Sequence, residues 1–188
     1  MPAAVAGPKN GTMKTLLGGL LCGLLAVPPP TPADGPHDFD FAFGTWTTRL
    51  SRLQRPLTGS KDWVEYSGST VVRAVWGGRA QLVELDVAGP AGRIEGLSLR
   101  LYDPGTRLWS LNYASARGGG MFPPSIGGFA DGKGTFASEE VMDGRKVRVR
   151  FVVTRITPDE YRYEQAFSGD EGRTWEANWI ATDTRVKD

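Results

Sequence analysis

Apolar and polar residues alternate with a period of two along most of the chain after residue 37. The clearest case is the segment 161–179, in which mostly aromatic residues occupy every second position on both sides of the turn-forming sequence Ser168–Gly172, with Gln165 and Ala177 as the non-aromatic members. Alternation of this kind around a Gly/Asp turn is typical of two antiparallel strands joined as a hairpin. The aromatic faces of both strands are therefore expected to point toward one core.

Other stretches with strand-forming composition lie between clusters of Gly, Pro and Asp. They are residues 45–53, 63–76, 80–87, 94–102, 108–115, 128–131, 134–141 and 147–153. About ten short strands, without an amphipathic helix of useful length, predict an all-β fold. Because consecutive hairpins need no long crossover, we expect a single up-and-down antiparallel β-barrel of about 8–10 strands.

The N-terminal residues differ in composition from the rest of the chain. Lys9 and Lys14 precede an apolar run at residues 16–27, and a proline-rich stretch of small residues follows. This order predicts a secretory signal peptide and proline-rich lead at 1–33, ahead of a barrel domain at 34–188. The mature protein is then expected in the periplasm or outside the cell.

Two features of this N-terminal segment leave alternatives open. Met13 is a second candidate start, because Met13 and Lys14 followed directly by the leucines form a more compact signal. Cys22 is an alternative lipid-attachment site, although Gly19–Leu21 lack the small residue usually found directly before such a cysteine.

Charge and cysteine content narrow the choice of partners. The 188-residue chain has a formal net charge of +1, and without residues 1–33 it has 20 basic and 21 acidic residues and no cysteine. Nucleic acid and anionic membrane surfaces attract a basic excess, so this balance argues against both. The apolar run at 16–27 is short for a transmembrane helix, and we expect no integral membrane span in the mature chain. The oligomeric state stays open.

The scarcity of histidine and cysteine excludes several kinds of chemistry. His37 is the single histidine and precedes the first expected strand, so a zinc site cannot be assembled and a Ser–His–Asp triad has one remote candidate. The glycine-rich residues 118–120 do not lie between a strand and a helix, which argues against a phosphate-binding loop. We therefore expect no metal site and no cofactor, and we assign no catalytic residue.

Two parts of the chain resemble lipocalin-like (calycin) proteins. His37–Phe41 followed by Gly44–Trp46 resembles the start of these barrels, where a Gly-x-Trp sequence opens the first strand. Residues 109–185 are similar to an uncharacterised bacterial family of lipocalin-like domains, with matches at Pro123–Pro124, Gly128–Phe129, Asp131–Gly134, Arg150–Phe151, Glu164–Ser168, Asp170–Gly172, Thr174–Trp179 and Arg185. The resemblance implies a calycin-type barrel and brings no established active site.

The resemblance has further implications for the two ends of the domain. Haem-binding barrels of this type use a histidine from late in the chain as iron ligand, and His37 lies too early, so haem is not expected. In lipocalin-like barrels an arginine on the last strand often packs over the first-strand tryptophan, a role that Arg185 and Trp46 match. We also expect Trp46 and Trp179 to meet where the barrel closes.

Strand parity allows two interpretations of one polar set. Arg150, Glu164 and Asn178 fall on one face of three neighbouring strands. They either form a patch that orients a ligand inside the barrel or point outward with the charged residues that share their parity. The opposite parity is mostly apolar and is the expected interior: Val149, Phe151, Tyr163, Gln165, Phe167, Trp175 and Trp179.

Our first hypothesis is an exported barrel that binds a small, mainly apolar or aromatic molecule, with Arg117–Ile126 as a lid over one mouth. Its candidate ligand-binding residues are Trp46, Trp109, Tyr113, Arg150, Tyr163, Glu164, Gln165, Asn178 and Trp179. The first alternative is a structural or interaction module with a filled barrel. The second is a small-molecule enzyme, in which Glu164 would have to supply the acid/base group because imidazole is absent.

Overall fold

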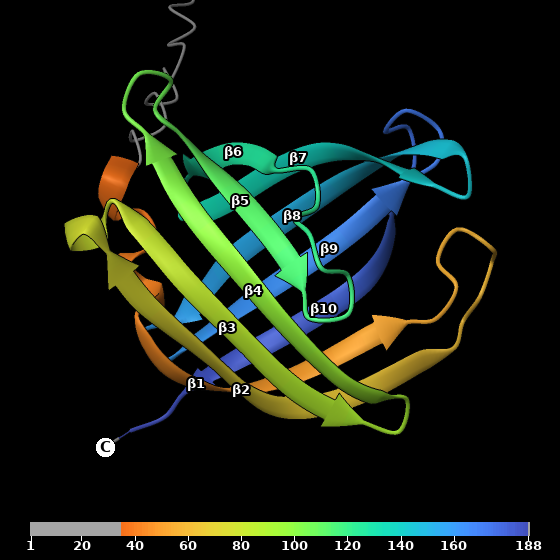
Figure 1. The fold of residues 1–188 in the computed structure, drawn as a ribbon, viewed down its shortest axis with the longest axis horizontal. Coiled ribbons are helices and arrows are strands. Elements are labelled where there is room, and N and C mark those ends of the chain that lie inside the picture. Colours follow the sequence, from red (N-terminus) through yellow and green to blue (C-terminus); the bar gives the residue numbers. More distant parts are fainter. Residues whose placement is uncertain (1–34, 188) are drawn as a thin grey trace, which may run out of the picture.

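The fold is a closed β-barrel in a computed structural model that describes residues 35–187 (Figure 1). Within this range ten antiparallel strands follow one another around the barrel, and the last pairs with the first. The strands are β1 Gly44–Leu53, β2 Trp63–Val75, β3 Ala80–Gly89, β4 Gly92–Asp103, β5 Leu108–Ser115, β6 Ser125–Ala130, β7 Lys133–Met142, β8 Arg145–Thr157, β9 Glu160–Ser168 and β10 Glu176–Arg185. The predicted all-β, up-and-down antiparallel barrel is confirmed.

Three short 3-10 helices complete the described chain: η1 Gly35–His37, η2 Asp40–Ala42 and η3 Trp76–Gly78. No helix in the described part is long and apolar enough to cross a membrane. The expected signal peptide at 1–33 lies outside the described residues.

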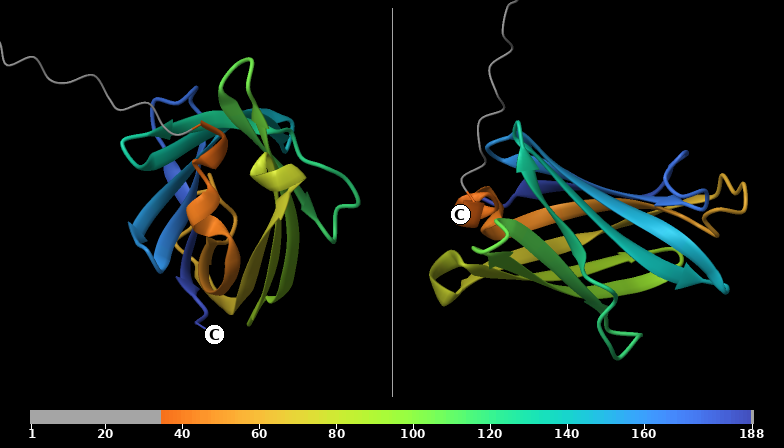
Figure 2. Two further views of the ribbon diagram at one scale, coloured as in Figure 1. Left: turned by 90° about the vertical axis from the view of Figure 1, so that its left-hand side faces the viewer. Right: turned by 90° about the horizontal axis from the view of Figure 1, so that it is seen from above.

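The N-terminal segment with η1 and η2 plugs one end of the barrel, as the two further views in Figure 2 show. Phe39 is completely buried there, with its ring edge-on to Trp109 at 5.1 Å and stacked on Phe136 at 5.6 Å. The indole nitrogens of Trp46 and Trp109 donate to the backbone oxygens of Ala42 (2.8 Å) and Gly35 (3.0 Å). Both tryptophans thus bury their rings and also satisfy their N–H groups on the plug.

Arg185 connects this plug to β1 and β10, the two strands that close the barrel. Its guanidinium carbon lies 4.1 Å from the Trp46 ring centre, so the predicted cation–π contact is confirmed. Nη1 and Nη2 donate to the backbone oxygens of Phe43 and Phe41, both at 2.8 Å. One side chain therefore joins β10, β1 and the plug.

The expected meeting of Trp46 and Trp179 does not occur. In the β1–β10 register Trp46 lies opposite Arg185, whereas Trp179 lies opposite Arg52. Six residues of strand separate the two positions along β1, which is about 20 Å. Trp46 therefore belongs to the plugged end and Trp179 to the other end, where the odd-to-even hairpins β1–β2, β3–β4, β5–β6, β7–β8 and β9–β10 turn (Figure 1).

Two glycines permit a close approach of neighbouring strands. A Cβ added at Gly68 in β2 would lie 2.1 Å from the backbone oxygen of Asp86 in β3. At Gly127 in β6 it would lie 1.9 Å from the backbone oxygen of Thr135 in β7. Any side chain at either site must push the backbone of the next strand outward. Strand interiors use glycine in this way where a barrel bends sharply.

We expect Gly68→Ala to lower the free energy of unfolding by about 1–3 kcal/mol, because the new methyl group overpacks against backbone that cannot rotate away. Gly120→Ala is the matched control, since its Cβ would meet nothing within 4 Å and its backbone angle suits alanine. Urea unfolding followed by tryptophan fluorescence measures both. Equal stability of the two variants would show that β2 and β3 are not packed this closely.

Candidate functional site

A cavity of about 430 Å³ occupies the barrel between the plug and the opposite end. It reaches the loops at that end, where Pro56, Arg93 and Arg117 line it. The plug closes the other side through Phe39 and its buried neighbours. The cavity is therefore a pocket with a floor, walls and one mouth.

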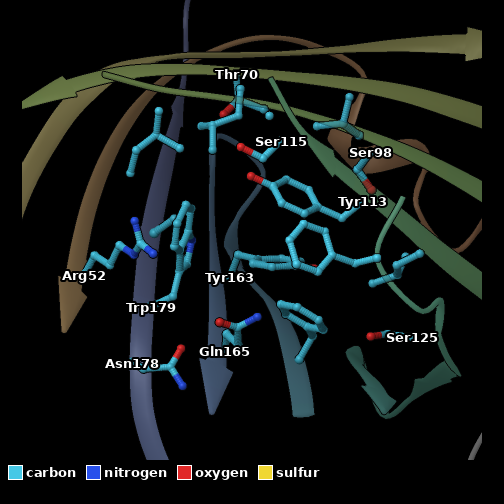
Figure 3. A pocket seen from close by; sticks show the side chains of 18 of the residues that line it. Arg52, Thr70, Ser98, Tyr113, Ser115, Ser125, Tyr163, Gln165, Asn178 and Trp179 are labelled. Carbon is cyan, nitrogen blue, oxygen red and sulfur yellow. The ribbon is translucent and has the colours of Figure 1, made fainter. Parts of the chain in front are cut away.

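Aromatic side chains from four strands, β5, β8, β9 and β10, form the walls. The rings of Tyr163 and Phe151 lie 5.3 Å apart, and both residues line the cavity. Tyr113 extends into the cavity from β5, and Trp179 from β10 (Figure 3). Burial raises the pKa of the Tyr163 hydroxyl well above its usual range, so this group stays protonated and can donate a hydrogen bond.

The β5–β6 connection completes one wall. β6 pairs with β5 only from Trp109 to Leu111, so the last residues of β5 have β4 on one side and no strand on the other. The loop takes that place: Met121 bridges to Ala114, and the Phe122 N–H donates to the Tyr113 backbone oxygen at 2.8 Å. The segment expected to be a lid over the mouth thus lies along the wall, and its last two residues belong to β6.

The floor carries a cluster of buried polar groups. Thr48 donates from its hydroxyl to Oδ1 of Asp183 at 2.5 Å, and the Thr70 hydroxyl lies 2.6 Å from that of Thr48. Asp183 is 3% exposed and also interacts with the hydroxyl of Tyr161. All four residues line the cavity. Burial raises the pKa of the Asp183 carboxyl, against the opposing effect of the threonine hydroxyls and the positive charge of Arg100.

Arg100 supplies a buried positive charge at the same level. It is 5% exposed, and its guanidinium carbon lies 4.3 Å from the ring centre of Phe39 in the plug. Its Nη1 donates to Oε1 of Gln81 across a long 3.4 Å contact. The Gln81 side chain is completely buried, and its Nε2 has no hydrogen-bond partner within residues 35–187.

The structure brings together five of the nine residues proposed from sequence. These residues line the cavity: Tyr113, Tyr163, Gln165, Asn178 and Trp179. Trp46 and Trp109 lie instead in the packed plug, because their indole N–H groups are tied to plug backbone oxygens.

Arg150 and Glu164 lie on the outer side of the barrel. They line a surface depression together with Arg162, whose Nη2 lies 2.9 Å from Oε2 of Glu164. The Arg150 guanidinium stacks on Trp175 at 4.3 Å. Trp175 therefore does not lie in the barrel interior, where the sequence pattern predicts it. Of the polar set Arg150, Glu164 and Asn178, the first two therefore point outward.

A β-bulge explains why Asn178 separates from that outward set. The β9–β10 register shifts between Ala177 and Trp179, which leaves Asn178 as the extra residue. An extra residue breaks the two-residue alternation, so Asn178 and Trp179 both line the cavity. Uniform parity along 175–179 cannot predict this arrangement.

The floor residues were missed by the sequence reasoning. Thr48 and Asp183 share the parity of their inward neighbours Leu50 and Ala181, and Arg100 shares that of Ser98. A charged residue at an inward position of a strand is the signal that could have found them. Within residues 35–187, no group of three or more His, Asp or Glu side chains is arranged to hold a metal ion.

Comparisons with known proteins agree on the barrel architecture. No protein-family model and no curated protein matches the sequence. Among solved structures, the S-type phycobiliprotein lyase CPES from Guillardia theta is similar with a TM-score of 0.53 and 15% identity, over 80% of this chain and 91% of that one. The protein Rv2717c from M. tuberculosis is similar with a TM-score of 0.56 and 15% identity, over 84% of this chain and all of that one. At such identity the likeness establishes the fold alone.

The raised pKa of Asp183 predicts a pH-dependent stability. An unfolded aspartate ionises near pH 3.9, whereas the folded carboxyl ionises at higher pH because it is buried. Between the two pKa values the folded state binds more protons than the unfolded state. The contribution of Asp183 to the free energy of unfolding therefore falls as pH rises through that window. We expect the stability of wild type relative to Asp183→Asn to decrease as pH rises above the ordinary aspartate pKa of about 3.9.

Asp170→Asn is the control with the opposite sign. The Asp170 carboxylate accepts from the Thr174 hydroxyl and backbone N–H and from Ser168, and these hydrogen bonds lower its pKa. The stabilisation by Asp170 is lost as pH falls through the folded pKa. The free energy of unfolding of wild type relative to Asp170→Asn should therefore increase as pH rises. Urea unfolding at stepped pH tests both, and parallel pH profiles for the two variants would contradict the assignment.

Proposed function

We propose that this protein binds one small, mainly apolar molecule inside its barrel. The observation that carries the proposal is the cavity of about 430 Å³, closed by the plug at one end and lined by aromatic side chains. Pockets of about 300–1,000 Å³ with apolar walls and a few converging polar groups are typical of small-molecule sites. An eight- to ten-stranded barrel is wide enough for such a cavity.

The fold and the N-terminal sequence support two accompanying proposals. The first is that the chain belongs among the lipocalin-like, calycin-type barrels, in keeping with its closed antiparallel sheet and with the sequence resemblance across residues 109–185. The second is that residues 1–33 direct export and are removed, leaving the barrel domain at 34–188. The plug begins with η1 at Gly35, so cleavage near Asp34 leaves every described plug contact in place.

Neither alternative function has a specific observation in its favour. An interaction module with a filled barrel does not require the cavity. An enzyme that relies on Glu164 would have its acid/base group on the outer surface beside Arg162, away from the enclosed space. Small-molecule binding is the function that uses the enclosed space.

Filling the cavity should abolish binding. Ser98 lines the cavity from β4, and Ser98→Trp would place an indole where the ligand is proposed to lie. Ser67→Trp in β2 is the control, because Ser67 is exposed on the outer side. We expect native mass spectrometry of protein purified from its own host to find a bound small molecule in wild type and Ser67→Trp and none in Ser98→Trp. Equal retention by both variants, or an empty wild-type barrel that also fails to take up apolar compounds, would contradict the proposal.

The export proposal has its own test. We expect the intact mass of the protein isolated from the periplasm or culture medium to correspond to a chain that begins near Asp34. A mass that includes the apolar run at 16–27, in protein recovered from the cytoplasm, would contradict cleavage and export.

A further inference from the structure

The floor of the cavity holds a positive charge without a matching negative partner. Within the described residues, the ion pairs do not include Arg100, a residue that is only 5% exposed. Its contacts are the face of Phe39 and one long hydrogen bond to the neutral Gln81. An arginine keeps its charge at any ordinary pH, so it cannot escape this burial by losing a proton. A buried charge of this kind is costly unless a partner is supplied.

Asp183 does not serve as that partner. Its carboxyl is engaged by the hydroxyls of Thr48, Thr70 and Tyr161, and no oxygen of it lies within ion-pair distance of Arg100. The interaction between the two groups is long-range, and burial raises the pKa of Asp183 despite it. Asp183 therefore holds its proton to higher pH than an exposed aspartate does, and a protonated carboxyl does not repel a second carboxylate.

We propose that the ligand is an anionic amphiphile whose carboxylate enters first and binds the guanidinium of Arg100 at the floor. This inference rests on the proposed function and specifies its ligand class. A carboxylate matches the paired N–H groups of a guanidinium in two parallel hydrogen bonds, which are strong in a site that excludes water. Arg100 lines the cavity although it is only 5% exposed, and its hydrogen bond to Gln81 uses Nη1, which leaves further N–H groups for a ligand.

The remaining walls suit the apolar part of such a molecule. Phe151 lines the cavity together with Tyr163, Tyr113 and Trp179, and Figure 3 shows the last three around the same space. From Thr48 at the floor to Arg52 at the mouth, β1 runs four residues, or about 13 Å. An extended chain of medium length spans this distance, with its tail against the aromatic rings.

The arginines at the mouth are weaker candidates for the anion. Arg93 is engaged by both oxygens of Asp86, at 2.7 and 2.6 Å. Arg52 is exposed and lies beside Trp179 at 6.0 Å, where water and salt screen its charge. Arg52 is therefore the matched control: the same side chain lines the same cavity at its opposite end.

The test compares decanoate with 1-decanol, which have the same chain and differ in charge, by isothermal titration calorimetry at neutral pH. We expect wild type to bind decanoate at least about tenfold more tightly than decanol, because hydrogen bonds to a charged group contribute this much. Arg100→Gln should lose that preference and keep its decanol affinity within about threefold. Arg52→Gln should keep the preference.

Three outcomes would overturn the inference. Equal affinity of wild type for decanol and decanoate would show that Arg100 does not bind a carboxylate. It would not contradict small-molecule binding in the cavity. If Arg52→Gln loses the preference for decanoate and Arg100→Gln keeps it, the carboxylate binds at the mouth and not at the floor. If neither compound binds wild type, the amphiphile class is wrong, and the native mass spectrometry above decides the cavity function separately.

A measurement on wild type covers the case in which Arg100→Gln does not fold. Decanoate labelled with carbon-13 at its carboxyl reports its own titration by NMR when bound. Contact with the guanidinium should lower the pKa of the bound carboxyl below that of the free acid. A bound carboxyl that titrates at or above the free value would overturn the inference.

Discussion

The interaction on which the rest of the structure depends is the contact of Arg185 with Trp46 and the plug. It joins the last strand to the first through a cation–π contact and holds the plug through the backbone oxygens of Phe41 and Phe43. The same side chain therefore stabilises both the closure of the sheet and the closure of one end of the barrel. At this end Phe39 and Ala42 of the plug pack with side chains of the strands in one buried cluster.

The floor matters because it removes water from groups that would otherwise be solvated. Phe39 covers the guanidinium of Arg100 from the plug side, and the surrounding strands bury Asp183 and Tyr161. In this setting burial raises the pKa of the Asp183 carboxyl and that of the Tyr161 hydroxyl above their ordinary values. An apolar wall above a polar floor follows from the order of residues along each strand.

The architecture could be predicted from the sequence because it depends on local signals. Alternation and Gly/Asp turns identify the strands, and the resemblance of Gly-x-Trp and a late arginine to lipocalin-like barrels implies the closure at Trp46 and Arg185. The site could be predicted only in part, because it depends on register. The extra residue at Asn178 changes which side chains face inward, and nothing in the local composition marks the bulge. Arg100 and Asp183 were overlooked because charged residues are ordinarily assigned to the outer face.

A pocket with one mouth also has consequences for the rate of exchange. A molecule that lies head-down against the plug has to leave along the path by which it entered, past Trp179 and the Tyr113–Phe122 ring pair, whose centres are 5.7 Å apart. A second molecule cannot push it out from behind. Phe122 sits on a loop attached to β5 by a single bridge and one hydrogen bond at the Met121–Phe122 step. Residence time would then be governed by how often this short attachment opens, separately from how tightly the floor holds the headgroup.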